Sequence, residues 1–407
     1  MSAEITLDDY HWLVEGAGRG WLDNAIDDSL PLHQLAGKLR RQLNLTETHL
    51  VIEQHQLRHR ARKKFANAEN LFFTPIGLEQ ASDRMTADYK SHRFKTNERV
   101  ADLCCGIGGD LFSIGQRGPT VGFDRDQIAC YLAQTNVKTL QHTDSAVRQA
   151  DVTEIDFGSF DSVHIDPDRR TSGHRSVQLA NHQPSLEFLE RLVDKTANVA
   201  IKLAPATEAT ASMLAPAELE WIGSRRDCRQ LVAWFGRLGN QPGKRVATLI
   251  DATGWESFSG ALIPGEITSQ LGNYLIEPHP PVLAAGLAGQ LANENNLSFI
   301  THGGGYLTGA AAIRSPFCSS YQVIEILPFR PKRIKSALQK RNVGHLVVKK
   351  RAVNQDPRQV QRSCQPSQGE HSAVLFVTSI QERVTAIITQ PINEQKSNSI
   401  KNIHPES

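Results

Sequence analysis

The stretch VADLCCGIGGD (residues 100–110) decides the fold, because an apolar run ends there in a glycine-rich turn. The run is rich in β-forming residues and predicts a strand. Gly106, Gly108 and Gly109 allow the backbone to turn tightly and to approach a ligand closely. LFSIGQRG (111–118) follows and predicts a helix. A strand, a glycine turn and a helix in this order predict a ligand-binding turn in an α/β domain.

Short apolar runs and helical patterns alternate around this turn. The sequence predicts strands over residues 98–105, 119–124, 161–166 and 198–204, separated by helices over 111–118, 127–140 and 184–196. Such alternation predicts an α/β fold with a doubly wound, Rossmann-like, largely parallel sheet. Two later runs, 229–236 and 244–251, are joined by a Gly/Pro-rich turn. We expect them to form an antiparallel hairpin at the sheet edge.

The composition is that of a globular protein with more than one domain. The 407 residues are 40% hydrophobic and 22% charged, with a formal net charge of +2, and the length predicts two or three domains. The N-terminus lacks the apolar core of a signal peptide, and the longest apolar stretch, 282–292, is too short to span a bilayer. We therefore expect a cytoplasmic protein without a metal site, whose six cysteines lack zinc spacing and are reduced.

The pattern divides the chain into five parts, and the fourth is a small α+β unit. In that unit we expect strands over 321–329, 345–353, 373–380 and 384–390, with helices over 331–341 and 357–365. The five parts are a helical N-terminal segment (1–70), a Rossmann-like domain (71–255), a connecting region (256–315), the α+β unit (316–392) and a disordered tail (393–407).

Carboxylates at the predicted strand ends favour S-adenosylmethionine as the ligand. Asp102 can meet the ligand's amino group, whereas it would repel a pyrophosphate. Asp124, 22 residues later, suits the ribose hydroxyls, and Asp151 suits the adenine amine. Cys104 in the turn and Asp166 after the fourth strand complete the predicted cofactor site. NAD is the alternative ligand, although GxGG with acids on both sides fits it poorly, and each acid alone would also suit a helix cap.

The motif IDPDRR (165–170) ends the fourth predicted strand and places charged groups beside the expected ligand. We predict that Pro167 stiffens the turn and that Arg169 and Arg170 position substrate by stacking on a base or clamping a phosphate. The structural alternative is that Asp168 pairs with Arg170 and holds the loop together.

Two residues inside or after neighbouring strands are also candidates. Lys202 ends the fifth predicted strand and would either meet a substrate phosphate or pair with Asp166. His164 lies inside the fourth predicted strand, where we expect it to pack in the core.

Residues 98–205 resemble a class I S-adenosylmethionine-dependent methyltransferase. More closely, residues 57–390 resemble a bacterial group of methyltransferase-like proteins with a C-terminal THUMP-like domain. The motifs that carry the resemblance are FFTPIGLEQAS (72–82), VADLCCGIGGD, GFDRD (122–126), ADVT (150–153), IDPDRR, IKLAP (201–205), YLTG (306–309), SPF (315–317) and EILPFRPKRIKSALQKRNVGHLVVKKR (325–351).

The resemblance implies a bound S-adenosylmethionine, covered by Phe73, Thr74, Glu79 and Gln80. It also implies that Asp166, at the end of the fourth strand, orients the methyl acceptor. Amine-modifying members of the class carry Asn/Asp-Pro-Pro-aromatic at the position of DPDR. Here an acid and an arginine replace the second proline and the aromatic residue, so the acceptor atom stays open.

Basic residues concentrate in two segments. Residues 330–351 carry nine Lys or Arg and no Asp or Glu, which predicts a phosphate-binding surface that includes Lys349, Lys350 and Arg351. THUMP domains bind structured RNA, so the resemblance implies tRNA or rRNA as the partner. The second segment, 58–64, is either a solvated helix end or a nucleic-acid contact.

Taken together, these patterns predict an S-adenosylmethionine-dependent methyltransferase that acts on RNA. Two alternatives stay open. One is a catalytically idle protein that binds S-adenosylmethionine and RNA, and the other is a methyltransferase for DNA, protein or a small molecule.

Overall fold

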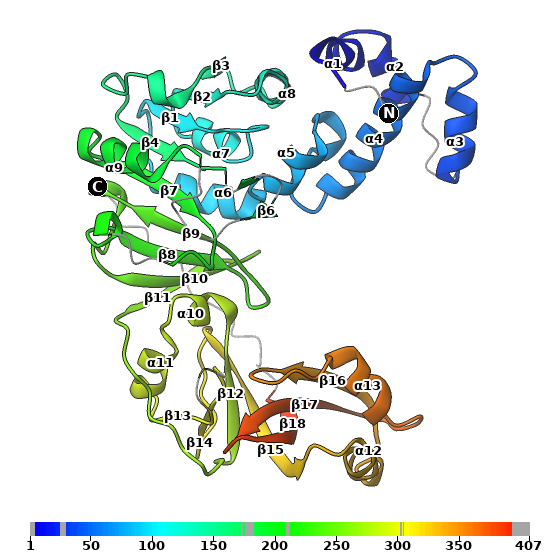
Figure 1. Ribbon diagram of the computed structural model, residues 1–407, viewed down its shortest axis with the longest axis vertical. Helices are drawn as coiled ribbons and strands as arrows, with labels where there is room; N and C mark the ends of the chain where they lie inside the picture. The colour runs from blue at the N-terminus through cyan, green and yellow to red at the C-terminus, as the bar shows by residue number, and fades with distance from the viewer. Residues whose placement is uncertain are drawn as a thin grey trace. The chain divides into compact units, whose positions relative to one another are not determined.

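The computed structural model describes residues 5–24, 30–168, 170–171, 174–175, 183–208, 212–301, 303 and 305–392. The chain forms two compact units, whose elements are labelled in Figure 1. The first comprises Met1–Gly223 and Cys228–Trp255, and the second comprises Ser224–Asp227 and Glu256–Ser407. Arg169 and the predicted tail lie outside the described residues.

A nine-stranded sheet forms the centre of the first unit, within the described part of the chain, and its edge strand β11 continues past the unit boundary at Trp255. Its order is β11-β10-β8-β9-β7-β4-β1-β2-β3, and β3, β2, β1, β4 and β7 are parallel to one another. This arrangement confirms the predicted Rossmann-like fold. The strands are β1 (Val100–Leu103), β2 (Thr120–Asp124), β3 (Ser145–Gln149), β4 (Ser162–Ile165), β7 (Val199–Leu203), β8 (Glu218–Gly223), β9 (Cys228–Trp234), β10 (Arg245–Asp251) and β11 (Gly254–Gly260).

The predicted hairpin at the sheet edge is wrong, because the strand β8 separates its two members. β9 is antiparallel to both β7 and β8, and β10 pairs with β8 in the parallel direction. β8 contains two buried acids, Glu218 and Glu220, so its sequence does not look like that of a buried strand. Arg93 lies 2.6 Å from Glu218 Oε1 and 3.2 Å from Glu220 Oε2, and these ion pairs offset the cost of burying both acids.

Helices cover this sheet and connect its strands. They are α6 (Arg84–Ser91), α7 (Leu111–Gly115), α8 (Gln127–Thr139) and α9 (Leu186–Lys195). Tyr89 of α6 and Ile114 of α7 share a core with Ala200, Val232 and Trp234 of the strands. The sheet is therefore buried by apolar helix faces that the sequence periodicity indicates.

The N-terminal helices belong to the same unit as the sheet. They are α1 (Leu7–Val14), α2 (Ala17–Asn24), α3 (Leu32–Leu39), α4 (Leu45–Ala61) and α5 (Pro75–Gln80). Leu13, Leu35 and Leu50 pack with Phe72 and with Leu132 of α8. The core of the N-terminal helices is thus continuous with the helical cover of the sheet.

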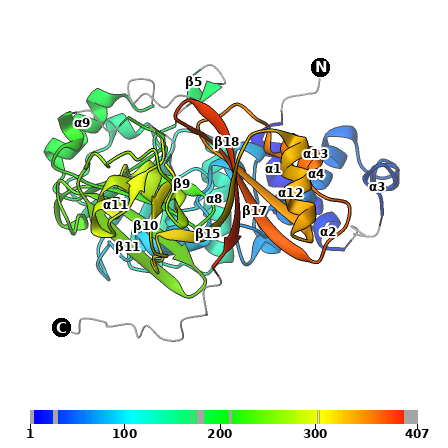
Figure 2. The same cartoon turned by 90° about the horizontal axis from the view of Figure 1, so that it is seen from below.

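The second unit contains a seven-stranded sheet within its described residues, in the order β13-β14-β12-β15-β18-β17-β16. The strands are β12 (Tyr274–Pro278), β13 (Ser298–Phe299), β14 (Leu307–Gly309), β15 (Cys318–Pro328), β16 (Val343–Lys350), β17 (His371–Ile380) and β18 (Arg383–Pro391). Two helices, α12 (Pro331–Lys340) and α13 (Pro357–Cys364), pack against each other and against β16. Figure 2 shows them together with β15, β17 and β18.

Residues 280–294 form two short helices, α10 (Pro280–Ala284) and α11 (Ala288–Glu294). The sequence pattern predicts one helix here. Gly286 adopts φ +71, which interrupts the helical path between the two. No helix among the described residues combines the length and the apolar character that crossing a membrane requires.

Candidate cofactor and acceptor site

The turn after β1 contains three residues in the left-handed region: Cys104 (φ +57), Gly106 (φ +53) and Gly108 (φ +96). A Cβ atom at Gly108 would lie 2.4 Å from the Phe112 ring, so a larger residue would have to displace a buried side chain. A Cβ at Gly106 would meet no described atom within 4 Å, and glycine is favoured there by conformation alone. The backbone around Gly106 is therefore open to a ligand.

Asp124, at the end of β2, holds this turn. Its Oδ2 accepts a hydrogen bond from Gly106 N at 2.8 Å, and its Oδ1 accepts one from Asp126 N at 3.0 Å. Burial raises the pKa of Asp124, although the backbone hydrogen bonds from Asp126 and Gly106 act in the opposite direction. Each carboxylate oxygen can accept a further hydrogen bond, as the hydroxyl groups of a ribose require.

Asp102 is buried at the end of β1, with 1% of its surface exposed. Its Oδ1 lies 2.7 Å from Nδ1 of His164, which is itself fully buried, so the predicted core position of His164 is confirmed. Asp102 Oδ2 is buried without a hydrogen-bond partner among the described residues. Burial raises the pKa of Asp102 despite the nearby His164. Its predicted contact with the cofactor's amino group stays a prediction.

Asp151 and Cys104 differ in their exposure. The exposed Asp151 caps a short 3₁₀ helix, since its Oδ1 accepts from Thr153 N at 2.9 Å and from Thr153 Oγ1 at 2.7 Å. The hydrogen bonds from Thr153 lower the pKa of Asp151. Burial raises the pKa of the Cys104 thiol, which keeps it protonated at neutral pH. The predicted cofactor contacts of both residues stay predictions.

The carboxyl ends of β4 and β7 bring Asp166 and Lys202 together. Lys202 Nζ donates to Asp166 Oδ2 at 2.5 Å, and Asp166 N donates to Leu103 O at 3.2 Å. The side chains are 13% exposed for Lys202 and 30% exposed for Asp166. Of the two roles considered for Lys202, the structure shows the pairing with Asp166. The adjacent Pro167 is buried and fixes the start of the loop.

The rest of the DPDRR loop is tied to two other segments. Asp168 Oδ1 accepts from Gln80 Nε2 at 3.2 Å. The backbone of Asp168 pairs with Gln183 through two hydrogen bonds of 2.8 and 2.9 Å. For Arg170 the structure describes only the backbone, in the two-residue strand β5 (Arg170–Thr171). The predicted roles of the Arg169 and Arg170 side chains, and the Asp168–Arg170 pairing, thus lie outside the described residues.

Lys90, a functional candidate that the sequence did not indicate, lies behind Asp166 together with Asp110. Lys90, which is 1% exposed, places Nζ 2.7 Å from Asp110 Oδ1, and Lys202 Nζ lies 3.7 Å from Asp110 Oδ2. Burial alone would raise the pKa of Asp110, but the ammonium groups of Lys90 and Lys202 hold it well below its usual range. Burial also lowers the pKa of Lys90.

These buried side chains form a network that supports Asp166 from behind through Lys202. Lys202 joins Asp166 to Asp110, and Ser82 Oγ donates to Asp110 Oδ2 at 2.7 Å. Lys90 reaches on to Nε2 of His164 at 3.4 Å. Asp110 ends the glycine motif and was visible in the sequence, whereas Lys90 comes from α6, about twenty residues earlier, and carried no motif.

The three cations predicted to bind RNA in the second unit have partners within that unit. Lys349 Nζ donates to Glu277 Oε2 and to Tyr321 Oη, and Glu277 raises the pKa of Lys349 against the opposing effect of burial. Arg351 Nη1 donates to Gly305 O at 3.1 Å, and Nη2 lies 3.6 Å from Glu277 Oε1. Lys350 is exposed. Contact of these three side chains with RNA stays a prediction.

Candidate metal ligands do not gather at one place in the part of the chain that the structure describes. No group of three or more His, Cys, Asp or Glu side chains there is arranged to hold a metal ion.

Comparisons with known proteins extend these observations. Residues 318–391 match the THUMP domain-like family. Two curated proteins of Mycobacterium tuberculosis, from strains CDC 1551 / Oshkosh and ATCC 25618 / H37Rv, are each 26% identical over 360 residues. The match covers 84% of this chain and 96% of each relative. Both relatives are described as uncharacterized S-adenosylmethionine-dependent methyltransferases.

A solved structure covers most of the chain. The crystal structure of a candidate methyltransferase from Porphyromonas gingivalis W83 superposes with a TM-score of 0.71 and 18% sequence identity. The match covers 90% of this chain and 100% of that one. These findings confirm the predicted fold class and the resemblance to methyltransferase-like proteins with a C-terminal THUMP-like domain.

Proposed function

We propose that the chain is an S-adenosylmethionine-dependent methyltransferase whose substrate is RNA. One arrangement carries the proposal: the open glycine turn, its carboxylate support Asp124 and the acceptor candidate Asp166 all follow strands of one parallel set. Because β2, β1 and β4 are neighbours, their carboxyl ends meet at the same edge of the sheet, where α/β folds bind ligands. The description of the two mycobacterial relatives supports the cofactor and the reaction.

The cofactor-binding part of the proposal assigns a role to each residue around the turn. The backbone at Gly106 and Gly108 approaches the cofactor, and the Asp124 carboxylate accepts from the ribose hydroxyls. Asp151 faces the adenine amine, while Asp102 and Cys104 line the methionine end. When bound, S-adenosylmethionine supplies an electrophilic methyl group at its sulfonium. The described carboxylates suit this cofactor, since it carries hydroxyl and amine donors and no pyrophosphate.

Asp166 is proposed to orient the acceptor. Methyl transfer is an in-line displacement, so the positions of the nucleophile and the methyl group supply much of the rate. The Oδ2 of Asp166 is held by Lys202, which leaves Oδ1 without a partner among the described residues and able to accept from an acceptor N–H or O–H. Lys202 and the Asp110–Lys90 pair behind it act as positioning residues. Arg169 and Arg170 are proposed to hold substrate phosphates or bases.

RNA is proposed as the substrate class because of the second unit. Its residues 318–391 match the THUMP domain-like family, and the helix α12 carries the exposed cations Lys332, Arg333 and Lys340. Clustered cations favour phosphate contacts. Few aromatic residues lie in this stretch, so backbone and shape recognition of a structured tRNA or rRNA fits better than base stacking.

Two observations favour a second candidate function, a catalytically idle protein that binds S-adenosylmethionine and RNA. The Asp166 carboxylate already has an ammonium partner in Lys202. The motif also lacks the aromatic residue that stacks on bases in amine-modifying members of the class.

A transfer assay with labelled S-adenosylmethionine tests the proposal. Purified protein is incubated with total RNA from cells that lack the gene, and wild type is compared with Asp166→Ala. We expect label in RNA from wild type and a loss of about 100-fold or more in the variant. Because Asp166 is also predicted to line the cofactor site, cofactor affinity measured by calorimetry should fall far less than methyl transfer. The matched control is Glu154→Ala, which removes an exposed carboxylate outside the proposed site.

Two results would contradict parts of the proposal. Cofactor binding without transfer to RNA, DNA or protein would support the idle binder. Unchanged cofactor affinity in Asp124→Ala would contradict the assigned binding turn.

A further inference from the structure

A helical hairpin in the first unit carries a surplus of cations. Residues 30–64 contain eight Lys or Arg and two Glu. Two of the eight have structural roles: Arg58 is buried against Leu71 O, and Lys64 donates to three backbone carbonyls. The other six are exposed and form no ion pair with any described residue; these hairpin cations are Lys38, Arg40, Arg41, Arg60, Arg62 and Lys63.

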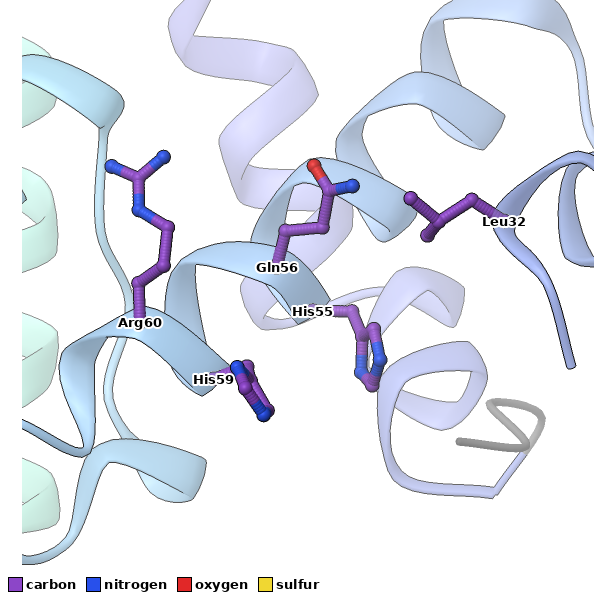
Figure 3. Close-up of a pocket in the computed structure, with 5 residues that line it drawn as sticks. All are labelled: Leu32, His55, Gln56, His59 and Arg60. Atoms are coloured by element: carbon purple, nitrogen blue, oxygen red, sulfur yellow. The ribbon is translucent and has the colours of Figure 1, made fainter. Parts of the chain in front are cut away.

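A shallow pocket lies on the same hairpin, with a volume of about 370 Å³. Leu32 from α3 and His55, Gln56, His59 and Arg60 from α4 line it, as Figure 3 shows. Along α4, His55 and His59 stand one turn apart, and so do Gln56 and Arg60. Imidazole, amide and guanidinium groups supply hydrogen-bond donors, and none of the five lining residues carries a carboxylate.

The chemistry of this surface fits a phosphodiester chain. The guanidinium of Arg60 can hold a phosphate through two parallel hydrogen bonds. The hairpin cations, which form no ion pair with a described residue, can neutralise further phosphates and release their counterions. The half-exposed side chain of Leu32 offers an apolar wall against which a ribose or base can rest. An anionic polymer with apolar faces matches these features together.

The end of α4 is fastened to the segment that supports the candidate acceptor loop. Lys64 Nζ donates to the carbonyls of Leu78, Glu79 and Ala81 at 2.8, 3.0 and 2.7 Å, around the end of α5. From α5, Gln80 donates to Asp168, two residues after Asp166. A ligand bound at the end of α4 is therefore held at a fixed position relative to that loop.

We propose that the hairpin cations and the α4 pocket form an RNA-binding site, which takes phosphodiester groups of the substrate and holds it in position for Asp166. The site lies in the first unit and is separate from the THUMP-like residues. It rests on the proposed function in one respect, namely that RNA is the substrate class.

The test measures binding of fluorescently labelled total tRNA to the full chain without cofactor, over a series of salt concentrations. The variant Arg60→Gln/Arg62→Gln/Lys63→Gln is expected to bind about 10-fold more weakly. The slope of log affinity against log salt should fall by about 2, because fewer counterions are released. The matched control, Lys138→Gln/Arg191→Gln/Lys195→Gln, removes three exposed cations from α8 and α9 and should stay within about 2-fold of wild type.

A second variant isolates the pocket from the general charge. Gln56→Ala/His59→Ala keeps every Lys and Arg, so it should weaken binding about 3- to 10-fold with little change in the salt slope. Thermal unfolding of each variant shows whether the helix is intact. A hairpin variant that unfolds like wild type and binds tRNA like the control would overturn the proposal. Equal competition by a DNA duplex of the same length would overturn the assignment to RNA.

The outcome is distinguishable from a failure of the proposed function. Wild type that binds RNA through the hairpin but transfers no methyl group contradicts the methyltransferase and supports this site. If wild type methylates RNA and the hairpin variants bind and transfer normally, the methyltransferase is supported and the proposed RNA-binding site is contradicted.

Discussion

Two basic segments of the chain, the α3–α4 hairpin and residues 330–351, hold their cations in different ways. In the hairpin, six cations are exposed and form no ion pair with described residues. In the second segment, the α12 cations Lys332, Arg333 and Lys340 are exposed as well. Other cations of this segment are paired: Lys349 and Arg351 contact Glu277, and Arg341 contacts Glu325 at 2.9 Å. Glu277 precedes Lys349 by 72 residues. The cations that a ligand can use therefore depend on acids far away in the sequence, and a local count of charges does not reveal them.

The largest expected effect on stability is at Lys90, which is buried and ion-paired, unlike the exposed hairpin cations. Lys90→Met should destabilise the first unit by about 3–5 kcal/mol, because Asp110 would be left as a buried charge with a weaker partner. Chemical denaturation followed by circular dichroism measures this loss. The exposed Lys95→Met is the control and should change stability by less than about 0.5 kcal/mol.

The pH dependence of stability gives the same network a second test. The pKa of Asp110 lies well below its usual range in the folded chain. Its contribution to stability is thus complete above the unfolded value of about 4 and is lost as the pH falls through the lower folded value. A Lys90→Met deficit that is the same at neutral pH and far below pH 4 would argue against this ion pair.

A smaller effect is expected at the paired cations of the second unit. Glu277→Gln should destabilise that unit by about 2 kcal/mol, since Lys349 and Arg351 lose a partly buried partner. The same change frees two cations, so affinity for tRNA should rise about 3-fold. Thermal unfolding and fluorescence binding separate the two effects. Lower stability with lower affinity would break the distinction between paired and available cations.

The smallest change in stability is expected on α12. Lys332→Gln/Arg333→Gln/Lys340→Gln removes exposed cations and should alter stability by less than about 0.5 kcal/mol. Affinity for tRNA should fall about 3- to 10-fold if these residues contact phosphates, and the salt slope should fall with it. Wild-type affinity in this variant, together with weak binding in the hairpin variant, would place RNA recognition on the first unit alone.

Much of the fold was predictable because it depends on local patterns. The alternation of apolar runs with helical periodicity gave the parallel sheet, and the glycines after β1 gave the turn that Gly106 and Gly108 adopt. The six elements from β15 to β18 follow the order that the sequence predicts. Each of these signals is contained within about fifteen neighbouring residues.

The incorrect predictions concern residues whose interaction partners lie far away in the sequence. β8 was missed because Glu218 and Glu220 look unsuited to a buried strand until Arg93 is placed beside them. Without β8, the two flanking strands looked like a hairpin. Lys90 could not be predicted for the same reason, since its role depends on Asp110, which a different element supplies.

The candidate site was predictable in part. The position of Asp166 follows from the strand that precedes it, and its pairing with Lys202 was one of two roles that the sequence left open. The side chains of Arg169 and Arg170 lie outside what the structure describes, so their predicted roles stay predictions. A charged loop after a strand has many possible partners, and local sequence does not select among them.

The continuity between the N-terminal helices and α8 has a consequence for inheritance. Asn136 of α8 exchanges two hydrogen bonds with the backbone of Phe72, and Leu132 packs against Leu13 and Leu35. A recombination event that removed the first seventy residues would leave α8 with an uncovered apolar face and α5 without the hydrogen bonds from Lys64. The helical segment and the sheet should therefore be transmitted together, and lineages that lose one should lose the other.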